Sequence, residues 1–244
     1  MLLLVGLGNP GAQYSGNRHN VGFQIVEAIA DHHNFTPARE KFKGVIREGN
    51  IAGSKALILK PATFYNESGN SVREAATFYK IPTDKIFVIH DEIDLAPGKV
   101  KMKSGGGTAG NNGLKSISAH MGNDFFRIRI GIGHPGDKSK VTAHVLSNFS
   151  KSDHTEWLDD LVQDIARNVS HLMDHNNGRD RFLSAISSMP TQSAPTKESQ
   201  SSKSEKLHEA HAQKSASSLL TEKKPASPFD KLKGLLRNDQ EGKS

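Results

Sequence analysis

The chain of 244 residues contains no cysteine. Disulfide bonds and thiolate metal sites are therefore excluded. Long apolar runs are also missing, since none approaches the roughly 20 consecutive apolar residues that a membrane-spanning helix needs. Met1 leads directly into a short apolar segment, without the basic region that opens a signal peptide. These absences predict a cytoplasmic protein with no membrane partner.

Large apolar residues are scarce in the last quarter of the chain. From Met189 onward, Ser, Lys, Glu, Gln, Ala and Pro dominate, and such a composition buries too little surface to offset the entropy lost on ordering. We therefore expect one folded domain over residues 1–188 and a disordered basic tail over residues 189–244. Within the tail, apolar residues of 227–237 recur at helical spacing, which fits either a transient amphipathic helix or a docking segment.

Charge carries little information about the partner. The formal net charge is +6 at pH 7 and the sequence pI is about 9.4. A mildly basic surface suits a polyanionic partner, and it is equally compatible with an ordinary solvated surface.

Apolar patterns with period 2 alternate along the chain with patterns of period 3.6. Interleaved strands and helices predict an α/β fold, a single domain with a mixed twisted sheet and helices on both faces. The expected strands are 2–6, 44–50, 55–59, 85–89, 100–103 and 125–132, and the expected helices are 20–33, 68–79, 114–121 and 153–173, with residues 181–186 closing the domain.

Several motifs match known functional signatures, but the sequence around them does not support those functions. Residues 6–11 match G-x-G-x-x-G after a strand, but Pro10 removes an amide and a loop continues to Arg18, where a dinucleotide site needs a helix. The tail sequence His208 to His211 is one residue short of H-E-x-x-H, and we predict no metal site. There is also no G-x-S-x-G nucleophile motif.

A His–Asp pair is the remaining candidate for chemistry. His19 lies at a loop-to-helix junction and Asp91 ends the most strand-like run of the sequence. A carboxylate that fixes the tautomer of an imidazole makes it a working general base, and water is then the nucleophile. The residues alone leave a second interpretation open, in which His19 caps its helix and Asp91 merely enters a turn.

Five motifs in fixed order add a resemblance. They are VGLGNPG at 5–11 with Tyr14 and RHN at 18–20, KPATFYNESG at 60–69, HDEIDL at 90–95, GGG at 105–107 with NNGLK at 111–115, and RIRIGIGHP at 127–135. Together they resemble the bacterial peptidyl-tRNA hydrolases over residues 1 to about 187. The tail is not covered.

The resemblance implies a monomeric α/β hydrolase without metal or cofactor, which cuts the ester between a peptide and its tRNA. It implies that His19 is the base and that Asp91 keeps it basic and oriented. It assigns Asn9 to discrimination between blocked and free aminoacyl ends. Tyr14, Phe64, Asn66 and Asn112 correspond to substrate-contacting positions, and Lys103 and Arg129 to the pair that grips the tRNA 5′-phosphate.

Asparagine side chains suit that reaction, because they donate to an oxyanion without carrying charge and can accept from a peptide N–H. Two positions depart from the common pattern of the family. Tyr65 stands where Met is usual, and Asn111 where His is usual. Two other functions remain as alternatives, a non-catalytic tRNA-binding module and a nucleotide enzyme resting on the glycine motif at 6–11.

Overall fold

The computed structural model describes residues 1–174 and 176–187. The predicted tail 189–244 and its candidate helix at 227–237 lie outside the described residues. Among the residues described, no helix is both long enough and apolar enough to cross a membrane.

The described residues form one α/β domain around a seven-stranded mixed sheet, as the sequence predicts. The strand order is β2-β3-β4-β1-β5-β7-β6. Strands β4, β1, β5 and β7 run parallel, whereas β2, β3 and β6 pair antiparallel with their neighbours. The strands are β1 (Leu2–Gly6), β2 (Arg39–Lys41), β3 (Gly44–Ile51), β4 (Ser54–Pro61), β5 (Ile86–Glu92), β6 (Val100–Ser104) and β7 (Phe126–Gly131).

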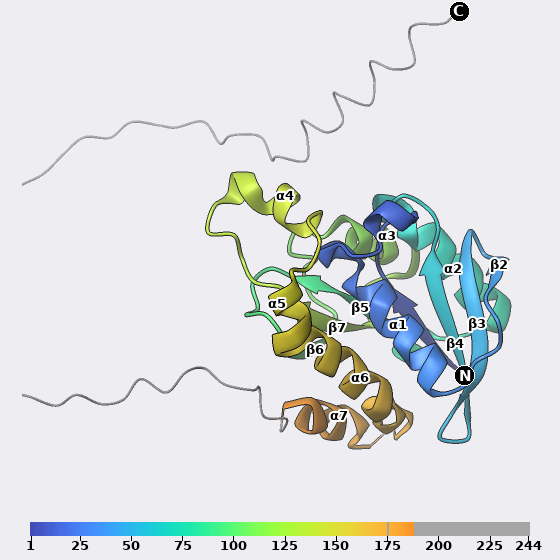
Figure 1. The fold of residues 1–244 in the computed structure, drawn as a ribbon. Coiled ribbons are helices and arrows are strands. Elements are labelled where there is room, and N and C mark those ends of the chain that lie inside the picture. Colours follow the sequence, from blue (N-terminus) through green and yellow to red (C-terminus); the bar gives the residue numbers. More distant parts are fainter. Residues whose placement is uncertain (175, 188–244) are drawn as a thin grey trace, which may run out of the picture. The chain divides into compact units, whose positions relative to one another are not determined.

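Helices cover both faces of this sheet (Figure 1). Helix α1 (Val21–His32) and helix α6 (Asp159–Asn168) lie on one face, and α2 (Ser68–Tyr79) and α3 (Asn112–Met121) lie on the other. The remaining helices are α4 (Val141–Val145), α5 (Lys151–Asp153) and α7 (Gly178–Ser187) among the residues described.

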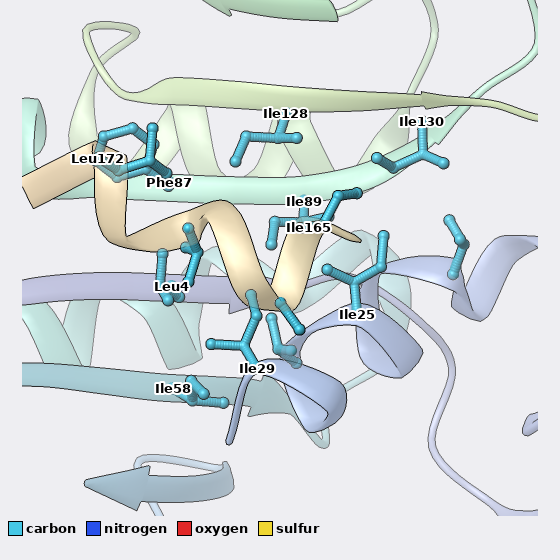
Figure 2. Packing of buried hydrophobic residues seen from close by; sticks show 14 of the residues in the cluster. Leu4, Ile25, Ile29, Ile58, Phe87, Ile89, Ile128, Ile130, Ile165 and Leu172 are labelled. Atoms are coloured by element: carbon cyan, nitrogen blue, oxygen red, sulfur yellow. The ribbon is translucent and has the colours of Figure 1, made fainter. Parts of the chain in front are cut away.

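The period-2 pattern of β1 explains the two apolar clusters of the core. Leu2 and Leu4 face the cluster under α1 and α6, while Leu3 and Val5 face the cluster under α2 and α3. Figure 2 shows the first cluster, where Ile25 and Ile29 of α1 and Ile165 of α6 pack on the strands. All residues of β1 are buried because helices cover both sides of it.

Two glycines set how closely α1 approaches the sheet. A Cβ on Gly22 would lie 2.3 Å from the carbonyl oxygen of Ile89, and one on Gly6 would lie 2.4 Å from the carbonyl oxygen of Gly22. No other residue type allows this approach. The N-terminus of α1, and the turn that precedes it, are thereby held against the ends of β1 and β5.

The long helix predicted over residues 153–173 is present, but its geometry changes along its length. The segment begins with α5, widens into a π-helical stretch at His154–Leu158 (η6), continues as α6 and tightens into a 3₁₀ turn at Val169–Met173 (η7). Apolar spacing alone does not reveal such changes, since a π-turn inserts one residue without ending the helix. In the π stretch, His154 Nδ1 contacts Asp159 Oδ1 at 2.8 Å and holds the wide turn.

Candidate active site

Polar side chains gather where the parallel strands β1, β4 and β5 end, as expected of an α/β sheet. The 3₁₀ turn Arg18–Asn20 (η2) contacts β5 and precedes α1. The 3₁₀ turn Tyr65–Glu67 (η3) follows β4 and contacts α3. Asp91 is in β5 itself, one residue before the strand ends.

His19 and Asp91 are in direct contact. His19 Nδ1 lies 2.8 Å from Asp91 Oδ1 and 2.9 Å from Oδ2. The imidazole keeps 18% of its surface exposed, while the carboxylate keeps only 4%. Burial would raise the pKa of Asp91, but the charge of His19 and the hydrogen bond from it lower that pKa overall. Asp91 is therefore ionised and accepts the Nδ1 proton, which leaves Nε2 of His19 with a lone pair.

Another histidine stands next to Asp91 in the sequence, but its position excludes it as a base that meets water. His90 is 2% exposed. Its Nδ1 donates to the backbone carbonyl of Asp91 at 2.7 Å, and burial lowers its pKa. A buried neutral imidazole of this kind has a packing role.

Tyr65 connects the His–Asp pair to η3. Its ring stacks on the imidazole of His19, with centroids 3.9 Å apart and planes 18° from parallel. Its hydroxyl lies 3.4 Å from Asp91 Oδ1 and accepts from Asn111 Nδ2 at 3.0 Å. Gly113 makes room for the ring, since a Cβ there would lie 2.7 Å from Tyr65 Cε1.

Asn9 is fixed through its backbone by Asn20. The Asn9 amide donates to Asn20 Oδ1 at 2.8 Å, and Asn20 Nδ2 donates to the Asn9 carbonyl at 2.9 Å. Asn20 is 2% exposed, whereas Asn9 is half-buried. These two hydrogen bonds hold the loop after β1 against the turn that carries His19. Because both involve the backbone of Asn9, its side-chain amide is available to a substrate.

The other predicted substrate-contacting residues lie on the same loops. Phe64 is 76% exposed and immediately precedes η3, which carries the exposed Asn66. Asn112 is half-buried and begins α3. Tyr14 is half-buried and ends the 3₁₀ turn Ala12–Tyr14 (η1). An exposed phenyl group with few protein neighbours is suited to stacking on a base or a side chain of a ligand.

Lys103 and Arg129 lie on the neighbouring strands β6 and β7, but they are not directly opposite. The register pairs Lys103 with Arg127 and Lys101 with Arg129. Arg129 donates to Glu92 Oε2 at 2.9 Å from both Nε and a terminal nitrogen. The predicted phosphate-binding pair therefore consists of an exposed lysine and an arginine that is already engaged by a carboxylate.

Arg127 has a different role from its neighbours in the register. It is only 2% exposed, and its terminal nitrogens donate to the carbonyls of Gly107 at 2.7 Å and Gly106 at 3.1 Å. It also donates to Asn123. This buried guanidinium fastens the glycine-rich turn at 105–107 beside Lys103.

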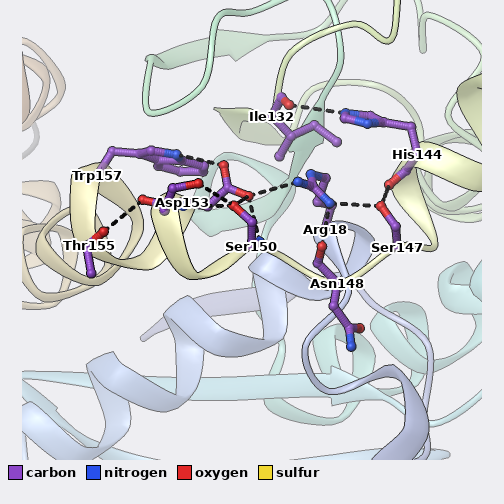
Figure 3. Close-up of polar contacts among 10 residues, drawn as sticks. Arg18, Ile132, His144, Ser147, Asn148, Ser150, Asp153, Thr155 and Trp157 are labelled. Carbon is purple, nitrogen blue, oxygen red and sulfur yellow. Dashed lines mark hydrogen bonds and ion pairs between the residues drawn. The ribbon is translucent and has the colours of Figure 1, made fainter. Parts of the chain in front are cut away.

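Arg18 fastens η2 to the segment that follows α4 (Figure 3). It donates to Ser147 Oγ at 2.8 Å, to the carbonyl of Asn148 at 2.5 Å and to Asp153 Oδ2 at 2.8 Å. Asp153 also forms a capping box with Ser150 at the start of α5. Because Arg18 precedes His19, these contacts restrain the turn that carries His19.

A cavity of about 720 Å³ adjoins the ion pair of Arg18 and Asp153. Its lining joins Arg18 and Asp153 to the loop after β5, the end of β7 and His144 of α4. His144 Nε2 donates to the carbonyl of Ile132 at 3.2 Å, which ties α4 to the rim. Among the described residues, no group of three or more His, Asp or Glu side chains is placed to hold a metal ion.

Asn20, Tyr65 and Asn111 are parts of the site that were not predicted from the sequence. Tyr65 and Asn111 were distinguished only as departures from a family pattern. Their contact joins segments 46 residues apart, and no periodicity or spacing in a single sequence predicts such a pair. Asn20 could have been found from its place directly after His19 in a polar motif that precedes a helix.

Comparisons with known proteins agree with one another. The family model for "Peptidyl-tRNA hydrolase" matches residues 3–193. Peptidyl-tRNA hydrolase of Novosphingobium aromaticivorans is 60% identical over 161 residues, which are 66% of this chain and 84% of the relative. That of Azorhizobium caulinodans is 57% identical, over 65% of this chain and 78% of the relative. The crystal structure of peptidyl-tRNA hydrolase from Acinetobacter baumannii is 38% identical with a TM-score of 0.71, over 77% of this chain and 95% of that one.

Proposed function

Because the chain belongs to the peptidyl-tRNA hydrolase family and is an enzyme of that family, we propose that it hydrolyses the ester joining a peptide to tRNA with His19 as base and Asp91 as its partner. The observation that carries the assignment of roles is the contact of His19 Nδ1 with both carboxylate oxygens, at 2.8 and 2.9 Å. This contact fixes the tautomer whose Nε2 can accept a proton.

The reaction then proceeds by two proton transfers through one imidazole. Nε2 of His19 removes a proton from water, whose oxygen attacks the ester carbonyl, and Asp91 stabilises the imidazolium that forms. When the tetrahedral intermediate collapses, the bond from the carbonyl carbon to the ribose oxygen breaks, and the imidazolium returns the proton to that oxygen. The products are an N-blocked peptide with a free carboxyl group and a tRNA with a free terminal hydroxyl.

Asparagine side chains supply the neutral donors and acceptors that this substrate needs. Asn66 and Asn112 flank the pair from η3 and the start of α3, where their amides can donate to the oxyanion. The side chain of Asn9 is available to accept a peptide N–H, because Asn20 binds only its backbone. A free α-ammonium group would bring three donors to one acceptor, which favours substrates with a blocked amine.

Phosphate recognition is assigned to the end of β6 and β7. Lys103 is exposed, and the buried charge of Arg127 stands beside it in the register. Arg129 can contribute its other terminal nitrogen while Glu92 holds its Nε and one terminal nitrogen. A tRNA 5′-phosphate placed here would gain charge-assisted hydrogen bonds that weaken with added salt.

The main alternative is a tRNA-binding module without catalysis. The contact of the ionised, buried Asp91 with His19 argues against this alternative. A binding module has no use for a costly buried charge aimed at a half-exposed imidazole. A nucleotide site at residues 6–11 would require a helix that begins within the glycine motif. Residues 6–11 lead instead into two 3₁₀ turns, and α1 begins only at Val21.

The deciding experiment compares N-acetyl-aminoacyl-tRNA with aminoacyl-tRNA as substrates and measures the release of free tRNA. We expect turnover of the blocked substrate only, and loss of that turnover in His19→Ala with tRNA affinity retained. The matched control is His120→Ala, since His120 Nδ1 donates to the carbonyl of Ser116 within α3 and has no hydrogen bond to the His–Asp pair. A His19→Ala variant with near-normal rate would end the assignment of the base.

A further inference from the structure

Tyr65 is in contact with Asn111 and with both members of the His–Asp pair. Asn111 Nδ2 donates to the Tyr65 hydroxyl at 3.0 Å, and that hydroxyl lies 3.4 Å from Asp91 Oδ1. The ring of Tyr65 covers His19 at 3.9 Å between centroids. One tyrosine thus touches both members of the pair, and one asparagine fixes the tyrosine.

Asn111 is itself held at both ends of its amide. Its Oδ1 accepts from the backbone amide of Leu114 at 3.0 Å and caps α3, so its Nδ2 must point to Tyr65. The result is a continuous chain of contacts from the first turn of α3 through Asn111 and Tyr65 to Asp91.

The direction of the Tyr65 hydrogen bonds follows from its surroundings. Tyr65 is 8% exposed, and burial together with the charge of Asp91 raises the pKa of its hydroxyl well above the usual value. The hydroxyl therefore stays protonated, accepts from Asn111 and donates to the carboxylate. A buried hydroxyl without partners would be destabilising, and both partners of this one belong to the site.

We propose that Tyr65 and Asn111 are positioning residues that hold the His19–Asp91 pair in its reactive geometry. The proposal rests on the proposed hydrolase function. The stacked ring prevents the imidazole from turning about its Cβ–Cγ bond, and the hydroxyl on Oδ1 limits rotation of the carboxylate below it. A base held in this way needs no reorganisation when it accepts a proton.

The test removes the hydroxyl and leaves the ring. Tyr65→Phe should lower kcat about 3- to 10-fold with KM unchanged, because the hydrogen bond that it removes from Asp91 is long at 3.4 Å and therefore weak. Asn111→Ser retains a residue that caps helices but cannot reach Tyr65, and it should lower kcat by a similar factor. In the double variant the two losses should not multiply, because both remove the same chain of contacts.

Tyr79→Phe is the matched control. The Tyr79 hydroxyl also donates to a carboxylate, that of Glu48, but it lies at the end of α2 away from the pair. Its loss should leave kcat unchanged. Rates are compared well below the melting temperature of each variant, so that a loss of stability is measured separately from a loss of rate.

A readout independent of turnover separates this inference from the proposed function. The ring current of Tyr65 shifts the NMR resonance of the His19 Cε1 proton, and Tyr65→Met should remove that shift, whereas Tyr79→Phe should not. If the wild-type chain fails to release tRNA but the shift responds as expected, the function is wrong and the positioning stands. A Tyr65→Phe variant with kcat within twofold of wild type, a loss confined to KM or to melting temperature, or losses that multiply would overturn the proposal.

Discussion

Replacing Asp91 by Asn tests the central contact of the site with almost no change in shape. The carboxylate meets His19 Nδ1 through both oxygens and is only 4% exposed. A hydrogen bond to a charged group contributes about 1.5–3 kcal/mol, and each 1.36 kcal/mol corresponds to a tenfold change in rate. Loss of the charge alone should thus lower kcat about 10- to 150-fold.

The asparagine side chain introduced at position 91 should lower kcat further, because it can turn its NH₂ group toward His19. Nδ1 would then accept a hydrogen bond, the proton would move to Nε2, and that nitrogen could no longer act as a base. This wrong tautomer brings the expected loss toward about 10³-fold. The acid limb of the pH–rate profile should also move to lower pH, because the lowered pKa of Asp91 shows a carboxylate that favours the imidazolium.

The assay is steady-state release of tRNA from a blocked aminoacyl-tRNA, with kcat and KM measured separately across pH. Asp164→Asn is the matched control, since Asp164 is 8% exposed and pairs with Arg167 on α6, outside the site. We expect it to retain the wild-type rate. An Asp91→Asn variant within threefold of the wild-type kcat and with an unmoved profile would refute the reasoning.

Two further predictions concern the cations around the site. Lys103→Ala and Arg129→Ala should each weaken the binding of tRNA that has a 5′-phosphate and leave a minimal substrate without phosphate unaffected. The loss of affinity should become smaller as the salt concentration rises. Equal weakening of both substrates would show that these residues do not bind phosphate. Arg18→Met should lower kcat about 10-fold while Asp153→Asn lowers it less, because Arg18 also holds two groups besides Asp153 and small displacements of a base are costly. Unchanged kinetics in both variants would mean that the contacts of Arg18 stabilise the fold and do not position His19.

The fold could be predicted from the sequence wherever periodicity is unbroken. Helix α2 was expected over 68–79 and spans Ser68–Tyr79, and the hairpin of β3 and β4 was expected from alternation on either side of Gly53. Apolar spacing predicted a helix at His154–Leu158 but did not reveal the change of helical geometry there. The tightness of a helical turn depends on tertiary contacts, such as the edge-on contact between the rings of Trp157 and Phe149, whose centroids lie 5.5 Å apart.

The site was predicted residue by residue, but its connections were not. Motifs and resemblance pointed to His19 and Asp91, whose contact is observed and whose catalytic roles stay a prediction. The partner of Arg129 is Glu92, which sequence reasoning did not find because the two stand on adjacent strands with no shared motif. Side-chain pairing across a sheet depends on register, and a single sequence does not give register between distant strands.

The position of β1 in the middle of the sheet has a consequence for how the chain folds. Leu3 pairs with Leu57 on one side and with Ile86 on the other, so β1 has no neighbouring strand until segments far along the chain have been brought to it. Pairings of this kind are slow to form because a long loop must close first. The segments carrying His19, Tyr65 and Asp91 come together only when those pairings are complete. A refolding chain should therefore recover activity in its last kinetic phase, after most helical signal has returned.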